Sequence, residues 1–201
     1  MIAIVDYDAG NIKSVEKAFL SMGGEVTITR DPEVILNSEK VVLPGVGNFG
    51  DAMNKLNSYG LTEVLKKVKE KNTPFLGICL GLQLLFEESE ESPGVQGLCL
   101  CEGKIRRIPD AEGLKVPQIG WNSLEFPREG RLFKGIKEGS YVYFVHSYYL
   151  EGRDNPVVTA TAEYGISVGA SIEKDNLFAC QFHPEKSSDV GLRILKNFMD
   201  L

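Results

Sequence analysis

The chain has 201 residues, 43% of them hydrophobic and 25% charged, a composition typical of a soluble globular domain. Its formal net charge of −6 argues against general nucleic-acid binding, because phosphate neutralisation requires a surplus of Lys and Arg. No apolar run approaches the roughly 18 residues of a membrane span, and the chain start lacks the basic segment of a signal peptide. With four cysteines and no secretion signal, we expect a cytoplasmic protein with reduced thiols and no membrane association.

The first half of the chain alternates short apolar runs with amphipathic stretches, a rhythm that predicts parallel strands joined by helices. In the first such stretch, Ile12, Val15 and Phe19 recur at helical spacing, and a pair of glycines at 23–24 ends it. The predicted strands are residues 2–6, 25–29, 40–43 and 74–78, and the predicted helices are residues 11–22, a short one from Pro32, 51–58, 61–71 and 80–87.

The second half is rich in strand-like runs and closes with an amphipathic helix at residues 189–201. Asp175 and Asn176 suit a tight hairpin turn between the last two strands. We therefore expect one α/β domain over residues 1–201, with a mainly parallel, doubly wound sheet that gains antiparallel strands and carries its site at the strands' carboxyl ends. The predicted strands of this half are residues 98–101, 104–108, 121–126, 141–150, 157–162, 168–173 and 177–182.

The segment Gly77-Ile78-Cys79-Leu80-Gly81 joins a predicted strand directly to a predicted helix. This is the pattern of a nucleophile elbow with Cys in place of Ser, in which glycines relieve the crowding of a sharp turn. Such a turn would place the thiol at a helix N-terminus, where free N–H groups favour a thiolate. The alternative is a buried core thiol, but the strand-to-helix context favours a nucleophile.

A cysteine nucleophile needs a base, and the chain has only two histidines. His183 ends a predicted strand and is followed by Pro184 and Glu185, so the carboxylate can orient the imidazole while the ring accepts the thiol proton. His146 is the rival base. Its place between Phe144 and Tyr148 on one face of a strand is more typical of a structural histidine, although it could line a pocket.

Attack on an amide creates an oxyanion, which needs preorganised hydrogen-bond donors. One candidate donor is the backbone N–H of Leu80, directly after the nucleophile. The other would come from the Pro44-Gly45-Val46-Gly47 segment, at the end of the neighbouring strand. Gly45 or Gly47 could permit a peptide flip that switches this donor on and off, and the sequence leaves open which glycine does so.

The cysteine elbow, the PGVG loop and the HPE segment together resemble the class I, or triad, glutamine amidotransferases. Further matches occur in DYDAGN, PGVGNFG, GICLGLQLL, PQIGWN, FVHSYY and HPEKSS, which follow one another in the family's order along the whole chain. The resemblance is weakest in residues 104–114, 125–140 and 151–174, and Ser147 stands where other members carry Thr. Within the family, it is strongest to the branch that supplies ammonia to imidazole glycerol phosphate synthase in histidine biosynthesis.

The resemblance implies a flavodoxin-like fold, glutamine as substrate, and no metal or cofactor. It implies that Cys79 attacks the glutamine carboxamide and that His183 and Glu185 complete the triad. It implies that Gln83 and Gly47 contact the substrate. It also implies that the oxyanion is surrounded by Gly45, Val46, Gly47 and Leu80. The residues implied to hold the substrate's amino-acid end are His146, Ser147 and Tyr148.

The resemblance also implies a second subunit, a HisF-like (β/α)8-barrel cyclase that receives the ammonia and forms a heterodimer with this chain. An oxyanion donor that points away until this partner binds would leave the isolated chain nearly inactive. Trp121 could equally be a core residue. The residues implied to face the partner are Asn11, Pro117, Trp121, Asn122, Tyr143 and Lys186.

Three alternatives stay open on the sequence. The chain could serve another synthase, such as that of anthranilate, aminodeoxychorismate, guanylate or pyridoxal phosphate. It could be a non-catalytic module whose Cys79 thiol senses oxidation, or a cysteine peptidase built on the same elbow. Cys99, Cys101 and Cys180 are expected to pack in the core, because a metal site would need more ligands.

Overall fold

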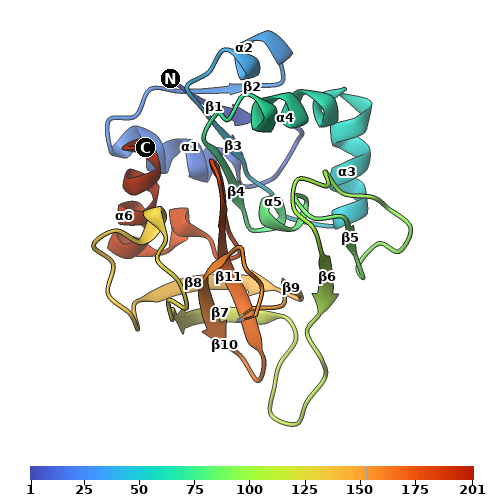
Figure 1. The fold of residues 1–201 in the computed structure, drawn as a ribbon, viewed down its shortest axis with the longest axis vertical. Coiled ribbons are helices and arrows are strands. Elements are labelled where there is room, and N and C mark those ends of the chain that lie inside the picture. Colours follow the sequence, from blue (N-terminus) through green and yellow to red (C-terminus); the bar gives the residue numbers. More distant parts are fainter. Residues whose placement is uncertain (153) are drawn as a thin grey trace.

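The computed structural model describes residues 1–152 and 154–201. Figure 1 shows an α/β architecture in which helices flank a central sheet and further strands lie at one end. The elements are β1 (Ile2–Val5), α1 (Ile12–Ser21), β2 (Val26–Thr29), α2 (Pro32–Leu36), β3 (Lys40–Leu43), α3 (Phe49–Ser58), α4 (Leu61–Glu70), β4 (Phe75–Ile78), α5 (Leu80–Gln83), β5 (Glu88–Ser89), β6 (Lys104–Arg107), β7 (Gln118–Ser123), η1 (Arg131–Phe133), β8 (Tyr141–His146), β9 (Tyr148–Leu150), β10 (Val158–Glu163), β11 (Ser167–Lys174), β12 (Leu177–Cys180), η2 (Pro184–Lys186) and α6 (Ser188–Met199).

The central sheet has seven strands in the order β10-β11-β12-β4-β3-β1-β2. The five strands from β12 to β2 run parallel, whereas β10 and β11 are added antiparallel at the other edge. Asp175 and Asn176 form the turn between β11 and β12, as predicted. The predicted fold class, a mainly parallel doubly wound sheet with antiparallel strands in the second half, is therefore confirmed.

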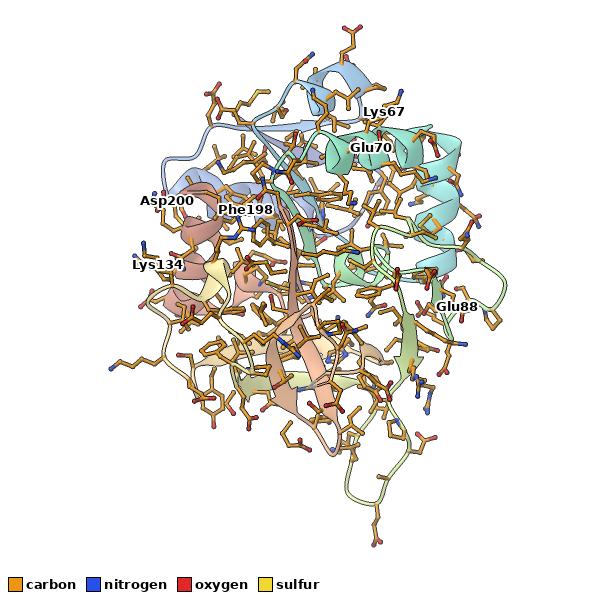
Figure 2. The ribbon with its side chains drawn as sticks, viewed as in Figure 1. Lys67, Glu70, Glu88, Lys134, Phe198 and Asp200 are labelled. Atoms are coloured by element: carbon orange, nitrogen blue, oxygen red, sulfur yellow. The ribbon has the colours of Figure 1, made fainter. Side chains whose placement is uncertain are left out.

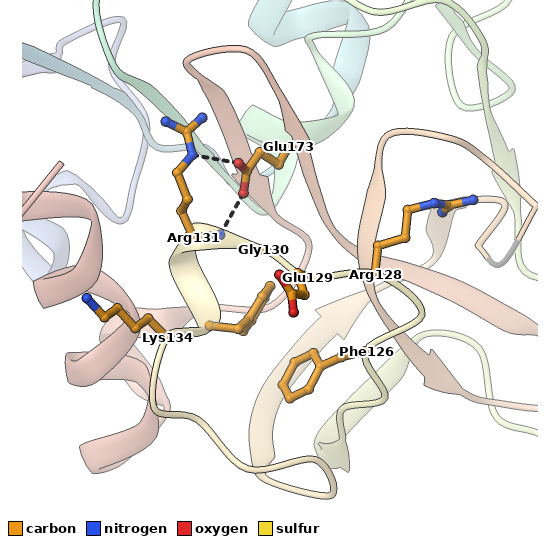
Figure 3. A pocket seen from close by; sticks show the side chains of 8 residues that line it. Phe126, Arg128, Glu129, Gly130, Arg131, Lys134 and Glu173 are labelled. Carbon is orange, nitrogen blue, oxygen red and sulfur yellow. Dashed lines mark hydrogen bonds and ion pairs between the residues drawn. The ribbon is translucent and has the colours of Figure 1, made fainter.

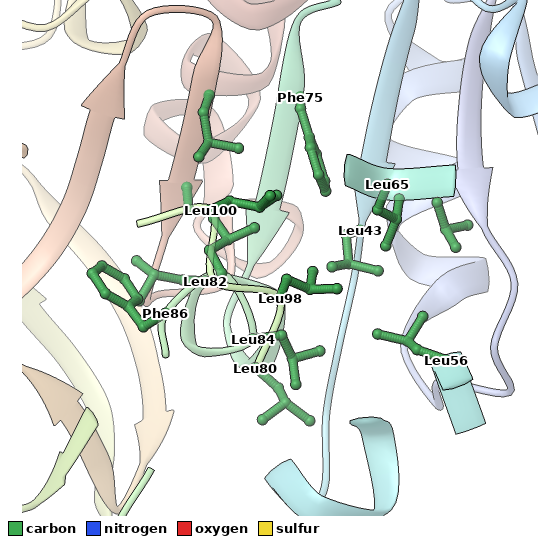
Figure 4. Packing of buried hydrophobic residues seen from close by; sticks show 14 of the residues in the cluster. Leu43, Leu56, Leu65, Phe75, Leu80, Leu82, Leu84, Phe86, Leu98 and Leu100 are labelled. Carbon is green, nitrogen blue, oxygen red and sulfur yellow. The ribbon is translucent and has the colours of Figure 1, made fainter. Parts of the chain in front are cut away.

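The sheet is covered on both faces, which explains why its central strands are apolar throughout. On one face, α3, α4 and α5 pack with residues such as Leu43, Leu65 and Phe75, which interdigitate in Figure 4. On the other face, α1 and α6 contribute Phe19 and Phe198 to a second cluster. Figure 2 shows Phe198 turned into the molecule, while charged side chains such as those of Lys134 and Glu88 project from its rim.

Two smaller sheets lie beyond the carboxyl ends of the central strands. β5, β6 and β9 form one, and the antiparallel pair β7–β8 forms the other. Within the described residues, no helix is both long enough and apolar enough to cross a bilayer.

Four predicted elements differ from the structure in type or by more than two residues. The strand predicted over residues 121–126 lies at residues 118–123 instead. Residues 98–101 are not a strand: the N–H groups of Leu98 and Leu100 instead donate to the carbonyls of Leu84 and Leu85, just past α5. The helix predicted over residues 80–87 ends at Gln83, because the chain turns there to meet this segment. Residues 141–150 form two strands in different sheets, separated at Ser147.

The cysteines follow from this arrangement. Cys101 and Cys180 are buried, as predicted, whereas Cys99 is exposed and has a positive φ of 54°. The alternation of LCLC therefore placed Cys101 correctly in the core and Cys99 incorrectly. All four cysteines are free thiols.

Candidate active site

The predicted catalytic groups converge at the carboxyl ends of three adjacent strands. Cys79 directly follows β4, His183 follows β12, and the PGVG loop follows β3. These strands are neighbours in the order β12-β4-β3, so the topology brings together residues that are more than a hundred positions apart in sequence. This location agrees with the rule that open α/β sheets bind ligands at the carboxyl ends of their strands.

The turn at Cys79 is a strained elbow. Its φ of 55° and ψ of −108° lie in a region that non-glycine residues rarely occupy, as expected where a functional side chain is forced above a sheet edge. A Cβ on Gly81 would lie 2.0 Å from the carbonyl oxygen of Leu43, and one on Gly77 would lie 2.7 Å from that of Gly81. Only glycine at these two positions lets the elbow pack against β3 and β4.

The sulfur of Cys79 lies in a largely buried polar setting, with the residue 6% exposed. Its Sγ contacts the carbonyl oxygen of Val145 at 3.9 Å, a bond in which the thiol is the donor. The side-chain amide of Gln181 donates to the same sulfur at 3.8 Å. The thiol is thus held between one acceptor and one donor, both fixed by the fold.

The imidazole of His183 is oriented by a carboxylate. Its Nδ1 contacts Oε1 of Glu185 at 2.8 Å, and both side chains are fully buried. The backbone of His183 is extended, with a φ of −97° and a ψ of 96°, and the short η2 turn that begins at Pro184 brings Glu185 back to the ring. Asn11 adds a third member, because its Nδ2 donates to the same Glu185 oxygen at 3.2 Å.

The electrostatic setting of His183 favours its protonated form. Burial alone lowers the pKa of the ring, but interactions with Cys79 and Glu185 outweigh this and raise the pKa to about 9. Nε2 has no hydrogen-bond partner of good geometry among the described residues. Cys79 therefore lies close enough to raise the pKa of the ring, although its sulfur makes no hydrogen bond of good geometry with Nε2.

His146 is buried and has both ring nitrogens hydrogen-bonded within the chain, as expected of a structural histidine. The residue is 6% exposed, its Nδ1 contacts the carbonyl of Tyr148 at 2.9 Å, and its Nε2 contacts the Gln118 amide at 2.8 Å. Burial lowers its pKa to about 4, so the ring is neutral near pH 7. Both ring nitrogens are already in use, which leaves His183 as the histidine able to accept a thiol proton.

The PGVG loop occupies one of the backbone N–H groups predicted to bind an oxyanion. The N–H of Leu80, one predicted oxyanion donor, donates to the carbonyl oxygen of Gly45 at 3.2 Å. Tyr7 fixes the base of the loop by donating to the carbonyl of Pro44 at 2.7 Å. Gly47 has a φ of +101°, a conformation that L side chains rarely adopt.

A cavity of about 340 Å³ opens above the sulfur. Gln83 forms part of its wall, and its Nε2 donates to the carbonyl of Tyr148 and to Oε1 of Gln181, each at 3.1 Å. Gly45 and Glu185 were predicted for the site but do not line the cavity. The predicted residues that do are Val46, Gly47, Cys79, Leu80, Gln83, Pro117, His146, Ser147, Tyr148 and His183.

Two polar groups of the site were missed by the sequence analysis. Glu91 lines the cavity, and its carboxylate accepts a hydrogen bond from the N–H of Phe49 at 2.7 Å, while burial raises its pKa. Glu91 lies in the acidic stretch of residues 87–91, a pattern that is typical of a solvated helix end. Gln181 is fully buried against Cys79 and gave no local signal beyond its position two residues before His183.

The residues predicted to face a partner divide into two groups. The first group is accessible at the surface: Trp121 is 52% exposed, Lys186 is exposed and Tyr143 is half-buried. The ring centroids of Trp121 and Tyr143 lie 6.0 Å apart in an edge-to-face arrangement. Asn11 is different: it is 5% exposed and holds Glu185, so this structure gives it a positioning role inside the chain. Asn122 uses its side chain to donate to the carbonyl of Glu163.

A larger hollow of about 570 Å³ lies elsewhere, between η1 and the end of β11. Figure 3 shows its lining, in which Arg131 and Glu173 form an ion pair. It contains none of the predicted site residues. Because it lacks a nucleophile or an oriented histidine, the smaller cavity at Cys79 is the candidate active site.

Comparison with known proteins agrees with this geometry. A subunit HisH of imidazole glycerol phosphate synthase from Moorella thermoacetica is 52% identical and covers 100% of this chain and 94% of its own length. The HisH subunit from Caldanaerobacter subterraneus subsp. tengcongensis is 50% identical, covering 100% and 98%, and that from Methanocaldococcus jannaschii is 48% identical, covering 100% of both chains.

Solved structures show the same fold at low identity. A glutamine amidotransferase crystal structure superposes with a TM-score of 0.76 at 20% identity, covering 100% of this chain and 98% of the other. PurLQS from Thermotoga maritima gives 0.74 at 17% identity, covering 99% and 97%. The family model for class I glutamine amidotransferases matches residues 3–201. The chain therefore belongs to the class I glutamine amidotransferase family.

Proposed function

We propose that this chain is one glutaminase domain, residues 1–201, that hydrolyses glutamine to glutamate and ammonia. It does so as the glutaminase subunit of imidazole glycerol phosphate synthase in histidine biosynthesis. The observation that carries the proposal is the buried His183–Glu185 pair beside an elbow thiol, above which a cavity opens. Relatives that match the whole chain at about half identity, and that bear the HisH name, support the choice of synthase.

The reaction follows from the placement of the groups. The thiol proton of Cys79 passes to His183, and Glu185 stabilises the resulting imidazolium, in line with the raised pKa of the ring. The thiolate of Cys79 then attacks the carboxamide carbon. The C–N bond then breaks, and the leaving nitrogen takes the proton from His183 to depart as ammonia, leaving a thioester. Water, deprotonated by His183, attacks the thioester carbon. The C–S bond breaks to release glutamate, and the sulfur regains a proton.

The cavity offers complementary groups for the rest of the substrate. Free glutamine carries an α-ammonium group, and Glu91 provides a carboxylate on the cavity wall. We assign Glu91 as the partner of that ammonium, because a partly desolvated ion pair is a strong anchor. Gln83 directs its amide oxygen away from Tyr148 and Gln181, which leaves it available to the substrate. The backbone from His146 to Tyr148 lines the part of the cavity proposed to hold the α-amino and α-carboxylate groups of glutamine.

The oxyanion site requires a change in the PGVG loop. A flip of the peptide between Gly45 and Val46 would remove the carbonyl that now occupies the Leu80 N–H. It would also turn the Val46 N–H toward the same region, so that two donors face the oxyanion. This explains why a loop with glycine at 45 and 47 suits an enzyme that must stay inactive until its partner arrives.

An exposed apolar face supports a partner subunit. Ile119, Trp121 and Tyr141, on the paired strands β7 and β8, are 63%, 52% and 59% exposed. The start of β7 directly follows Pro117, which lines the active-site cavity. Large exposed hydrophobic groups beside a site commonly mark an interface. We propose that the cyclase subunit, a (β/α)8 barrel, docks here and receives ammonia.

The decisive experiment measures ammonia release from glutamine by the wild-type chain and by Cys79→Ala, each with the cyclase subunit and its nucleotide ligand. We expect turnover in the wild type and none in Cys79→Ala, while both chains bind the cyclase equally. Retained turnover in Cys79→Ala would falsify the assignment of the nucleophile. Cleavage of peptides in place of glutamine would instead favour the peptidase alternative.

A further inference from the structure

Gln181 is a buried polar residue that the reaction outlined above does not use. It follows β12, is 0% exposed, and its backbone N–H donates to the carbonyl of Ala170 at 2.9 Å. A glutamine side chain loses much conformational freedom and its water contacts when buried, so it must make specific hydrogen bonds to be tolerated.

The two ends of the Gln181 amide contact the nucleophile and the cavity wall. Its Oε1 accepts from Nε2 of Gln83 at 3.1 Å, and its Nε2 donates to Sγ of Cys79 at 3.8 Å. The polarity of this arrangement is fixed by Tyr148. Its backbone carbonyl can only accept, and it binds the same Gln83 nitrogen at 3.1 Å. The Gln83 nitrogen is therefore the donor, and the Gln181 side chain accepts from it through its oxygen. The NH2 group of Gln181 consequently faces the sulfur.

We propose that Gln181 is a positioning residue that holds the Cys79 sulfur by N–H donation and favours its thiolate. The same amide locks Gln83 with its oxygen toward the substrate cavity. The proposal deepens the glutaminase function and rests on it, because it assigns Cys79 as the nucleophile.

The need for such a donor follows from the other groups that face the sulfur. Two of them are titratable, the His183 ring that receives its proton and the Tyr7 phenol, and the third is a backbone carbonyl. The carbonyl oxygen of Val145 contacts Sγ at 3.9 Å and suits the thiol, which can donate to it. Once the proton leaves, that oxygen faces a negative sulfur and stabilises it no longer. A donor on the sulfur then favours the charged form, and its effect is large where water is scarce. Gln181 is placed to supply this donor, since its amide already points at the sulfur.

The test uses the pH midpoint of Cys79 alkylation by iodoacetamide, measured in the folded chain without glutamine. In Gln181→Met and Gln181→Leu, which differ in shape but both lose the amide, we expect the midpoint to rise by about one pH unit. We expect kcat with the cyclase subunit to fall about ten- to a hundredfold. The matched control is Gln118→Met, which removes another buried glutamine amide that contacts His146 and not the sulfur. Its alkylation midpoint should stay at the wild-type value.

A measurement on the wild-type chain needs no variant at Gln181. The side-chain 15N amide signal of Gln181 should titrate with the alkylation midpoint and lose this titration in Cys79→Ala. An unchanged midpoint in both Gln181 variants, an equal shift in the control, or a Gln181 signal that ignores the sulfur would each overturn the proposal. Failure of the glutaminase function itself looks different. Wild-type chain with cyclase would release no ammonia, whatever the alkylation midpoints show.

Discussion

The backbone N–H of Leu80 donates to the carbonyl oxygen of Gly45 at 3.2 Å, so a group suited to bind an oxyanion is occupied by the protein itself. In this arrangement the tetrahedral intermediate lacks a preorganised donor, and loss of one such donor typically slows amide chemistry by about two to three orders of magnitude. We therefore expect very low glutaminase activity in the isolated chain and strong stimulation by the cyclase subunit. Ammonia release with and without that subunit tests this. Full activity of the chain alone would show that the Gly45 carbonyl does not block the site.

The geometry of the elbow predicts that a side chain at position 81 is strongly destabilising. A methyl group there would lie 2.0 Å from the carbonyl oxygen of Leu43, a backbone atom that cannot move without disturbing β3. We expect Gly81→Ala to lower the free energy of unfolding by more than about 3 kcal/mol, or to prevent folding. Gly113→Ala is the control: it meets open space but has a φ of +78°, so only backbone strain of about 1–2 kcal/mol applies. Urea unfolding of both variants measures the difference, and equal losses would contradict the steric argument.

The sequence predicted the parallel sheet correctly, and the structure brings Cys79, His183 and Glu185 to one place as expected, because both predictions depend on local patterns. Apolar strands, a nucleophile elbow and an HPE segment can each be recognised from a few consecutive residues. It failed at residues 98–101, where alternating Leu and Cys imitate a strand. The N–H groups of Leu98 and Leu100 instead donate to the carbonyls of Leu84 and Leu85. No local sequence pattern predicts these hydrogen bonds. Glu91 was missed for the same reason, because its partner, the N–H of Phe49, is distant in sequence.

Asn11 offers a test between a positioning role and an interface role. Its Nδ2 donates to the Glu185 oxygen that also contacts His183. Removing this bond should loosen the carboxylate and lower kcat by about tenfold in Asn11→Ala, because a hydrogen bond to a charged group contributes about 1.5–3 kcal/mol. We expect KM and the affinity for the cyclase subunit to change little. Steady-state kinetics and titration of the complex measure these separately. Weaker complex formation with unchanged kcat would place Asn11 at the interface.

The exposed face of β7 and β8 predicts where partner affinity resides. Trp121→Ala should weaken cyclase binding by at least about tenfold, because exposed aromatic side chains often dominate interface energies. Leu20→Ala is a matched control: Leu20 is 51% exposed, close to the 52% of Trp121, but it lies near the C-terminal end of α1. The dissociation constant of the complex between Leu20→Ala and the cyclase subunit should equal that of the wild-type complex. The comparison is made by titration calorimetry, and equal effects of the two substitutions would remove this face from the proposed interface.

The two histidines should make folding stability depend on pH in opposite directions. The pKa of His183 is raised from 6.5 to about 9, so the folded state binds its proton more tightly than the unfolded state. That contribution is fully present below pH 6.5 and is lost as the pH rises toward 9. The pKa of His146 is lowered to about 4 by burial, so its contribution is present above pH 6.5 and is lost as the pH falls toward 4.

Urea unfolding between pH 4 and 9.5 separates these effects when the wild type is compared with single variants. In His183→Gln, the loss of stability between about pH 6.5 and 9 should be reduced, because the group that releases a proton there is gone. In His146→Gln, the loss below about pH 6.5 should be reduced, since an uncharged amide replaces a ring that must remain neutral. The slopes are informative even if both variants are less stable overall, because linkage concerns the change with pH and not the absolute free energy. A reduced slope on the acid side in His183→Gln, with none on the alkaline side, would show that His183 is not held as a cation by Glu185 and Cys79.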